Sequence, residues 1–309
     1  MRFNSMSFNA LGTINQISAY SCPDSLLQAA TNRVRVIHDR MSAFLPASDV
    51  GRLNESAGIC PSPLHDDTLK LIRLALKICG QSGGAFDITV RPLVNLWNIG
   101  RKKNLPAKGE IEKIRTLVGF QTLHIDLLSH YAFLEKCGQS IDLGGIAKGC
   151  AADEARMILA AGGVQNALIN LGGNIVAMGT NCGNPWKIGL QNPLSGNADS
   201  FAVLPVSGKA IVTSGSNQQF YIRDSIRRHH ILDPRIGYPA QSGLLSVTVV
   251  CECSTLADAL STAVFVLGIE SGLKLLKNYN AEAVFALENG QIYVTGGLKI
   301  DLSMSQKKV

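Results

Sequence analysis

Residues 141–149 read Ile-Asp-Leu-Gly-Gly-Ile-Ala-Lys-Gly. This stretch predicts a strand that ends in a glycine-rich turn and opens into a helix. Such a junction presents backbone N–H groups and the positive end of a helix to an anion, and Lys148 adds a positive charge. The glycine spacing matches neither the phosphate loop of nucleoside triphosphatases nor the dinucleotide-binding fingerprint. Two interpretations therefore stay open, a phosphate site and a tight turn with an exposed lysine.

Helical periodicity continues on both sides of this stretch. Apolar residues spaced three or four positions apart predict helices at about 24–41 and 66–82. A third helix, 147–161, follows the glycine turn, and two more are predicted at 255–267 and 272–278.

Short alternating runs predict strands between these helices. They lie at 123–126, 131–133, 167–170, 175–178, 202–206, 210–212, 245–250, 283–287 and 291–294. Strands outnumber helices and do not alternate regularly with them, so we expect an α+β fold rather than a doubly wound sheet. No internal repeat divides the chain. We expect one domain over residues 1–309, with two intertwined lobes as the alternative arrangement.

The composition sets limits on the class of protein. Hydrophobic residues make up 46% of the chain and charged residues 17%, which favours a large core and excludes global disorder. The net charge is +6, but the basic residues form only short runs at 101–103, 227–228 and 307–308. Without a basic stripe, and with only 6% aromatic residues, no nucleic-acid partner is expected. An anionic small molecule fits the same charge.

The cysteines and the N-terminus bear on location. The eight cysteines are dispersed and form no C-x-x-C pair, so we expect free thiols in a reducing compartment. The first residues lack the apolar segment of a secretory leader, and no run of 18 apolar residues predicts a membrane span. The expected location is the cytoplasm, with an exported lipoprotein that lost its leader as the alternative.

Asp258 and Thr262 lie four residues apart on the predicted helix 255–267, about 40° apart around its axis. The apolar positions Leu256, Leu260 and Leu267 occupy the other face, so we expect both oxygen-bearing side chains to point away from the core. A carboxylate beside a hydroxyl or carbonyl suits Mg²⁺, which keeps waters or ligand phosphates as further partners. The alternative is an exposed helix on which Asp258 forms a cap or a salt bridge.

The run from His229 to Arg235 ends a predicted strand in a polar turn. Neighbouring strand residues face opposite sides, so we expect one of His229 and His230 to point inward and the other toward a ligand. Residues 84–90 form a β-like run with one acidic residue. No hydrolase triad or three-ligand zinc spacing stands out.

Taken in order, these segments resemble the ApbE family, the FAD:protein FMN transferases. The resemblance extends from Ala10 to about Gly268. The matching segments are Met41–Phe44, Gly84–Asp87, Pro92–Trp97, Asp142–Gly149, Asn170–Gly173, Thr213–Gly215, His229–Pro234 and Leu256–Ala263.

The resemblance implies an α+β fold with a mixed sheet, flanking helices and an FAD cleft between two lobes. It implies an enzyme that splits FAD at the pyrophosphate and attaches FMN through its phosphate to a Thr or Ser of an acceptor flavoprotein, with Mg²⁺ required. A Mg²⁺-dependent FAD pyrophosphatase that releases FMN and AMP is one alternative. A non-catalytic FAD-binding protein is another, although Asp258 and Thr262 argue against it because FAD storage has little need of a metal.

The resemblance also implies roles for individual residues. Mg²⁺ is expected on the side chains of Asp258 and Thr262 and on the carbonyl of Gly145. FAD is expected to contact Leu11, Phe44, Ala85, Phe86, Asp87, Asp142, Lys148 and Leu232. His230 and Asp258 are the implied catalytic residues. The proton acceptor stays open between His230, a carboxylate and a metal-bound group.

Three positions depart from the family pattern. Leu11 stands where methionine is usual and Phe44 where tyrosine is common, and both keep an apolar surface. Asn174 replaces the acidic residue that commonly follows the Asn-Leu-Gly-Gly segment, which weakens any role expected for that position.

Overall fold

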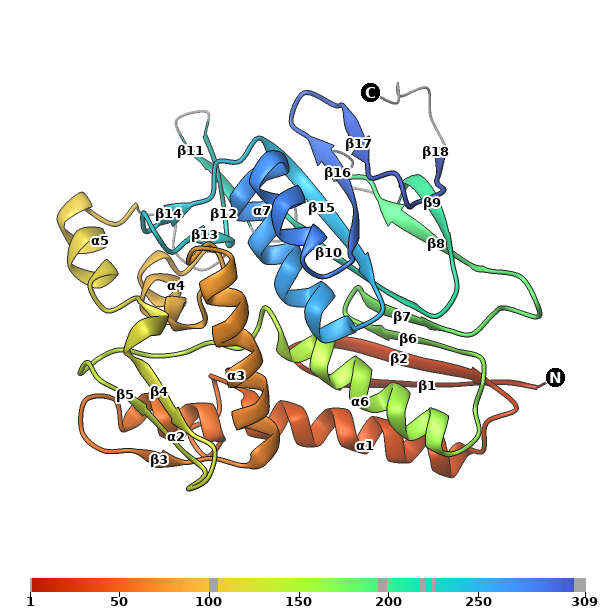
Figure 1. Cartoon of the computed structure of the whole chain (residues 1–309), viewed down its shortest axis with the longest axis horizontal. Coiled ribbons are helices and arrows are strands. Elements are labelled where there is room, and N and C mark those ends of the chain that lie inside the picture. The colour runs from red at the N-terminus through yellow and green to blue at the C-terminus, as the bar shows by residue number, and fades with distance from the viewer. Residues whose placement is uncertain (1, 100–104, 194–198, 217–219, 224–225, 303–309) are drawn as a thin grey trace.

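The computed structural model describes residues 2–99, 105–193, 199–216, 220–223 and 226–302 (Figure 1). The basic runs at 101–103 and 307–308 lie outside these residues.

An eight-stranded sheet forms the centre of the protein, in the spatial order β1-β2-β6-β7-β10-β15-β16-β17. Its strands are β1 (Phe3–Ala10), β2 (Thr13–Tyr20), β6 (Ala167–Leu171), β7 (Asn174–Met178), β10 (Lys209–Gly215), β15 (Leu244–Cys251), β16 (Glu282–Leu287) and β17 (Ile292–Val294). The α+β class and the flanking helices are confirmed. The sheet, expected to be mixed, is antiparallel in every described pairing, and hairpins form three of these pairings, β1–β2, β6–β7 and β16–β17.

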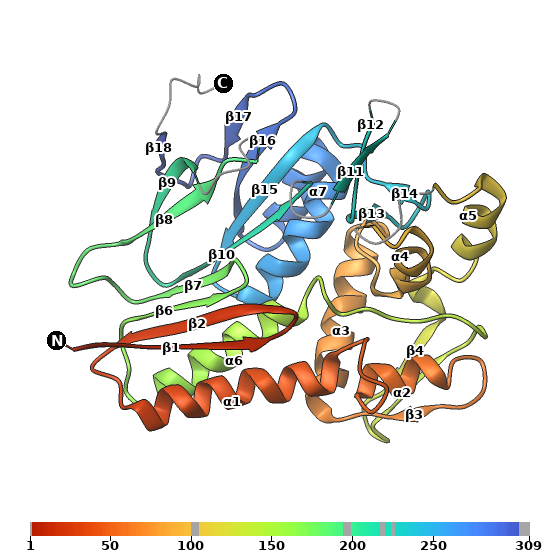
Figure 2. The same cartoon turned by 180° about the vertical axis from the view of Figure 1, so that it is seen from behind.

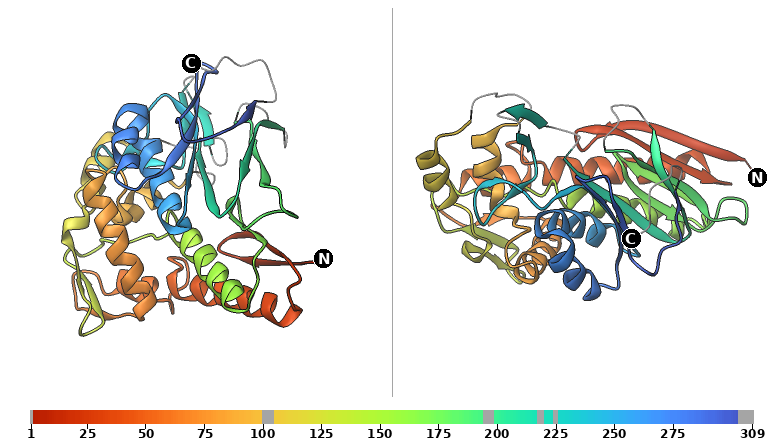
Figure 3. Two further views of the ribbon diagram at one scale, coloured as in Figure 1. Left: turned by 45° about the vertical axis from the view of Figure 1, so that its right-hand side comes forward. Right: turned by 90° about the horizontal axis from the view of Figure 1, so that it is seen from above.

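Long helices cover one face of this sheet. Helices α1 (Asp24–Met41), α6 (Ala147–Ala161) and α7 (Ser254–Lys277) contact its strands, and α3 (Asp66–Gln81) packs against α7 (Figure 3). The predicted helices are confirmed. The two expected at 255–267 and 272–278 are the halves of α7, which is interrupted at Gly268, where the backbone has φ 75° and ψ −175°.

A second, three-stranded sheet covers the opposite face, with β8 (Trp186–Gln191), β9 (Ser200–Val206) and β18 (Asp301–Leu302) in the order β18-β9-β8. Figure 2 shows β8 and β9 beside the large sheet. Apolar side chains of these two strands form a cluster with Ile211 and Val250 of the large sheet. The strand β8 was not predicted, although its side chains alternate strictly between buried and exposed.

The remaining elements gather beside α3 and around the end of the large sheet (Figure 1). They are α2 (Asp49–Glu55), β3 (Ser62–Pro63), η1 (Ile88–Val90), α4 (Arg91–Trp97), α5 (Lys108–Arg115), η2 (Phe120–Thr122), β4 (Leu123–Asp126), β5 (Tyr131–Leu134), β11 (Phe220–Arg223), β12 (Ile226–His229), β13 (Leu232–Asp233) and β14 (Tyr238–Pro239). The predicted hairpin at 123–133 is confirmed as β4 and β5.

Two predicted strands are absent from the described structure. Residues 84–90 form a turn followed by the short helix η1, because the Asp87 side chain accepts hydrogen bonds from the N–H and the hydroxyl of Thr89 and closes the turn locally. Residues 141–143 belong to no strand or helix. Their place is fixed instead by Asn54, whose side chain pairs with both backbone groups of Ile141.

Helices α6 and α7 cap each other. Neither has a capping side chain of its own at its N-terminus. Asp153 of α6 accepts hydrogen bonds from the backbone N–H groups of Ser254 and Thr255, at 3.1 and 2.8 Å. In return, Asp258 of α7 accepts one from the N–H of Gly149, at 2.9 Å. Each helix therefore supplies a carboxylate that accepts from backbone N–H groups in the first turn of the other.

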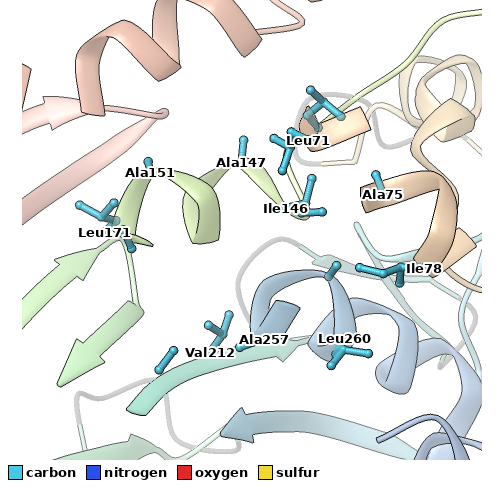
Figure 4. Packing of buried hydrophobic residues seen from close by; sticks show 14 of the residues in the cluster. Leu71, Ala75, Ile78, Ile146, Ala147, Ala151, Leu171, Val212, Ala257 and Leu260 are labelled. Carbon is cyan, nitrogen blue, oxygen red and sulfur yellow. The ribbon is translucent and has the colours of Figure 1, made fainter. Parts of the chain in front are cut away.

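This exchange needs a close approach of the two helices. A Cβ atom on Gly149 would lie 2.3 Å from the carbonyl oxygen of Ser254, so only glycine fits there. Ala147 and Ala151 of α6 and Ala257 of α7 are small buried side chains of the main apolar core around these helices (Figure 4).

Helix α7 is long and apolar enough to cross a membrane by composition alone, but 61% of its most apolar window is buried inside the protein. It packs between the sheet and α3, which is the arrangement of a core helix. The prediction of one domain remains a prediction. Its support is the largest apolar cluster, which runs in sequence from Phe8 to Phe285.

Replacing Asp153 with Ala should lower the free energy of unfolding by about 1–3 kcal/mol, because two helix N–H groups and the Thr255 hydroxyl lose their acceptor. Urea unfolding followed by circular dichroism measures the change. The matched control is Glu154→Ala on the same helix, which removes only the pair with Arg33 and should cost less than about 1 kcal/mol. Equal losses in the two variants would contradict the capping role.

Candidate active site

A cleft of about 610 Å³ opens at the junction of α6 and α7, with β7, β10, β8 and the turn before η1 as its other walls. This volume lies within the usual range for small-molecule sites. The cleft brings together nearly all the residues expected to form a site: Phe44, Ala85, Phe86, Asp87, Asp142, Gly145, Lys148, His230, Leu232, Asp258 and Thr262.

Leu11 is the exception, since it is not among the described residues that line the cleft. It lies in the turn between β1 and β2 with φ 55°, and its N–H donates to Nδ1 of His38. Its half-buried side chain packs against the main core.

Asp258 is buried, with 4% of its surface exposed, although it was expected to point away from the core. The expectation was wrong because residues 254–269 of α7 include no exposed residue, so the part of the helix that carries Asp258 has no outer face. Burial raises the pKa of Asp258, while the charge of Lys148 and the amide of Gly149 act in the opposite direction. The anion that the α6 N-terminus binds here is therefore the carboxylate of Asp258.

Other oxygen-bearing groups line the same cleft as Asp258. Thr262 lies one turn along α7, and its Oγ1 is 3.4 Å from Oγ of Ser214. Gly145 is adjacent, since a Cβ atom placed on it would lie 3.5 Å from the Thr262 hydroxyl. Because Gly145 has no side chain, space remains next to that hydroxyl.

The types of ligand atom in the cleft indicate which metal ion they could bind. Within the described parts of the chain, no three His, Cys, Asp or Glu side chains converge on one point. One carboxylate with a hydroxyl and a carbonyl oxygen fits a hard cation that takes further ligands from water or phosphate, and it does not fit zinc.

Lys148 supplies the positive charge of the cleft. Its ammonium group donates to the carbonyl of Gly144 at 2.9 Å, which holds the side chain over the glycine turn. The turn itself is closed by Asp142, whose Oδ1 accepts from the N–H of Gly144. A phosphate placed here would meet the lysine rather than the helix amides.

The turn of residues 85–87 forms the facing wall. The Phe86 ring packs on the glycine turn, since a Cβ atom on Gly145 would lie 3.2 Å from it. The carboxylate of Asp87 already accepts hydrogen bonds from Thr89 and from the N–H of Phe120. Burial raises the pKa of Asp87, and these hydrogen bonds oppose the rise. Asp87 thus shapes this wall through its bonds to the protein.

The two adjacent histidines have opposite environments, as the strand pattern predicts. His229 is buried at the end of β12, where its Nε2–H donates to the carbonyl of Ala240 and its ring lies edge-on to Phe265. Burial lowers the pKa of His229 to about 4, so the ring is neutral near pH 7. His230 lines the cleft.

Several cleft residues had no predicted role in the site. Asn174 is the clearest, because it is 1% exposed and lies beside Asp258. Its Oδ1 accepts a hydrogen bond from the Ser254 hydroxyl at 2.6 Å, so its amide NH₂ group points away from Ser254. Ser214 of β10 is another, and it pairs with Ser261 and Thr262. Polar residues at the ends of predicted strands were the available signal for both.

Comparison with known proteins gives a consistent result. The sequence model of the ApbE family matches residues 11–285. FAD:protein FMN transferase of Treponema pallidum (strain Nichols) is 32% identical, over 93% of this chain and 85% of that protein. The protein of the same name from Klebsiella pneumoniae (strain 342) is also 32% identical, over 98% of this chain and 95% of its own.

Solved structures show the same likeness. The ApbE protein of Thermotoga maritima superposes with a TM-score of 0.87 at 32% identity, covering 96% of this chain and 98% of its own. The flavin transferase ApbE from Vibrio cholerae gives a TM-score of 0.83 at 27% identity and covers 98% of both chains.

The buried His229 should make stability sensitive to acid. Its pKa is about 4 in the folded protein and about 6.5 when unfolded, so below pH 6.5 the unfolded state binds a proton that the folded state does not. Stability is lost as the pH falls from 6.5 to 4, by roughly 2 kcal/mol at pH 5.

Urea unfolding at pH 7.5 and pH 5 measures this loss in the native protein and in His229→Gln, where it should shrink. His124→Gln, which removes an exposed histidine, is the matched control. If His229→Gln lost as much stability on acidification as the native protein, the buried neutral ring would be ruled out as the cause.

Proposed function

The chain belongs to the ApbE family, and on that premise we propose that it transfers FMN from FAD to a hydroxyl group of a protein. The relatives that match nearly the whole chain are named for this reaction. The observation that carries the proposal is the cleft in which Asp258, Thr262, Gly145 and Lys148 meet. One buried carboxylate, neutral oxygens and a lysine form a site for a pyrophosphate with its cation.

We propose that FAD lies along this cleft, with its pyrophosphate beside Lys148 and the glycine turn. The exposed Phe44 and the buried Leu232 both line the cleft and offer apolar surface to its rings, and Asp142 lines the cleft at the glycine turn. Contacts at Ala85, Phe86 and Asp87 belong to the same proposal. FAD would contact Leu11 only if it extended beyond the cleft.

Mg²⁺ is the cation that we propose for the site, held by the carboxylate of Asp258, the hydroxyl of Thr262 and the carbonyl of Gly145. When bound, it would neutralise charge on the pyrophosphate and polarise the phosphorus–oxygen bond that breaks.

The protein groups around the cleft have separate roles in the proposed reaction. The Gly149 amide and Lys148 favour the charged form of Asp258, which burial alone would disfavour. Lys148 is also placed to stabilise the charge of the transferring phosphoryl group. The acceptor hydroxyl attacks the FMN phosphorus, the bond to the AMP oxygen breaks, and AMP leaves with that electron pair. His230 is the proposed acceptor of the hydroxyl proton.

The proposed partner is a flavoprotein that presents a Thr or Ser to the cleft. The proposed location is the cytoplasm, and the support for it is that all eight cysteines are free thiols.

The proposal is tested by incubating the protein with FAD, Mg²⁺ and candidate flavoproteins encoded in the same genome. Fluorescence of the acceptor band in a denaturing gel, together with its intact mass, should show covalent FMN. Release of FMN and AMP with no labelled acceptor would favour the pyrophosphatase alternative. Binding of FAD with neither product would favour a carrier protein.

Asp258→Asn should lower the Mg²⁺-dependent rate on the order of 10³-fold, because the only carboxylate among the proposed metal ligands loses its charge. Asn keeps the size of the side chain and an oxygen for the Gly149 amide, so the fold should persist in thermal unfolding. Asp66→Asn, which alters an exposed carboxylate paired with Lys70, is the matched control. A near-native rate that still requires Mg²⁺ would place the metal elsewhere.

A further inference from the structure

Arg91 is the first residue of α4, and its side chain is nearly enclosed, with 12% of its surface exposed. One terminal nitrogen donates to Oδ2 of Asp142 at 3.0 Å, and the other donates to the carbonyl of Ala43 at 2.6 Å. The guanidinium carbon lies 4.6 Å from the centre of the Phe44 ring. Arg91 therefore ties together two segments that both reach the cleft.

Phe44 is unusual for a large apolar residue, because 79% of its surface is exposed. It lines the rim of the cleft, and its backbone N–H is held by the Ser42 hydroxyl. The Arg91 guanidinium covers the ring from one side, and the high exposure leaves the rest of the ring open. An exposed phenylalanine in a fixed orientation presents a flat surface on which another ring can stack.

We propose that Arg91 is a positioning residue that fixes Phe44 as a stacking platform for an aromatic ring of the substrate and orients Asp142 on the same rim. The proposal rests on the transfer reaction above for the identity of the substrate, FAD, whose adenine and flavin are both planar. The guanidinium, the Phe44 ring and the substrate ring would form a three-layer stack.

A direct contact between Arg91 and the pyrophosphate is the competing explanation. Two observations argue against this explanation. The charge of Arg91 is already paired with Asp142, and both of its terminal nitrogens are engaged by the protein. Arg91 is also not among the described residues that line the cleft, whereas Phe44 and Asp142 are. Its influence on the substrate must therefore pass through those two side chains.

A double-mutant cycle tests this route. The dissociation constant of FAD is measured by isothermal titration calorimetry for the native protein, Arg91→Ala, Phe44→Leu and the double variant. Each single variant should weaken FAD binding about 5- to 10-fold, since one stacking or cation–π interaction is lost. The double variant should be no more than about 2-fold weaker than Phe44→Leu, because Arg91 acts mainly through the ring.

Further ligands separate stacking from charge. Inorganic pyrophosphate has no ring, so Arg91→Ala should weaken its binding less than it weakens FAD binding. ADP or FMN should lose affinity according to which ring stacks. In turnover, Arg91→Ala should raise KM for FAD with kcat changed by less than about 2-fold. Arg91→Lys keeps the charge near Asp142 without the planar stack and should weaken FAD binding less than Arg91→Ala.

Arg35→Ala is the matched control, because Arg35 lies over the Phe8 ring at 5.6 Å and not at the cleft. Its FAD affinity should equal that of the native protein. Losses that multiply in the double variant, or an equal loss of pyrophosphate affinity, would overturn the positioning role. So would undiminished binding of both ADP and FMN by Arg91→Ala. Failure of the native protein to bind FAD at all would instead contradict the proposed function.

Discussion

The exchange of caps between α6 and α7 is the constraint on which the rest of the site depends. Asp153 of α6 satisfies the first N–H groups of α7, and Asp258 of α7 satisfies the Gly149 N–H of α6. The exchange brings two helix N-termini together at one end of the sheet, and Gly149 allows the contact because no side chain stands between the backbones. The carboxylate of Asp258 is thus held by the fold itself, at the base of the cleft.

This arrangement explains the electrostatics of the cleft. A buried carboxylate is costly unless hydrogen bonds and nearby positive charge compensate it, and Asp258 receives both from α6, through the Gly149 amide and Lys148. The remaining donors, on Thr262 and Gly145, are neutral. With one carboxylate and only neutral oxygens, the protein would not compensate the full charge of a divalent cation, and an anionic substrate would supply the missing negative charge. The proposed pyrophosphate chemistry follows from that balance.

The sequence allowed the fold class and the long helices to be predicted, because their apolar periodicity is local. Through the family resemblance, the sequence also predicted that Asp142, Lys148, Asp258 and Thr262 belong to one site. It could not predict the burial of Asp258, since α7 is apolar on nearly every side and has no clear outer face. The turn at Asp87 and the stack of Arg91 on Phe44 were also missed. Both depend on side-chain contacts that no periodic pattern records.

We propose that the α6–α7 junction is the place at which a cation meets the pyrophosphate of FAD. Anomalous diffraction from crystals grown with FAD and Mn²⁺, an electron-rich substitute for Mg²⁺, tests it directly. We expect one strong peak bounded by the Asp258 carboxylate, the Thr262 hydroxyl and the Gly145 carbonyl, next to the pyrophosphate and within reach of Lys148. A cleft that holds FAD while the Mn²⁺ peak lies away from Asp258 would contradict it.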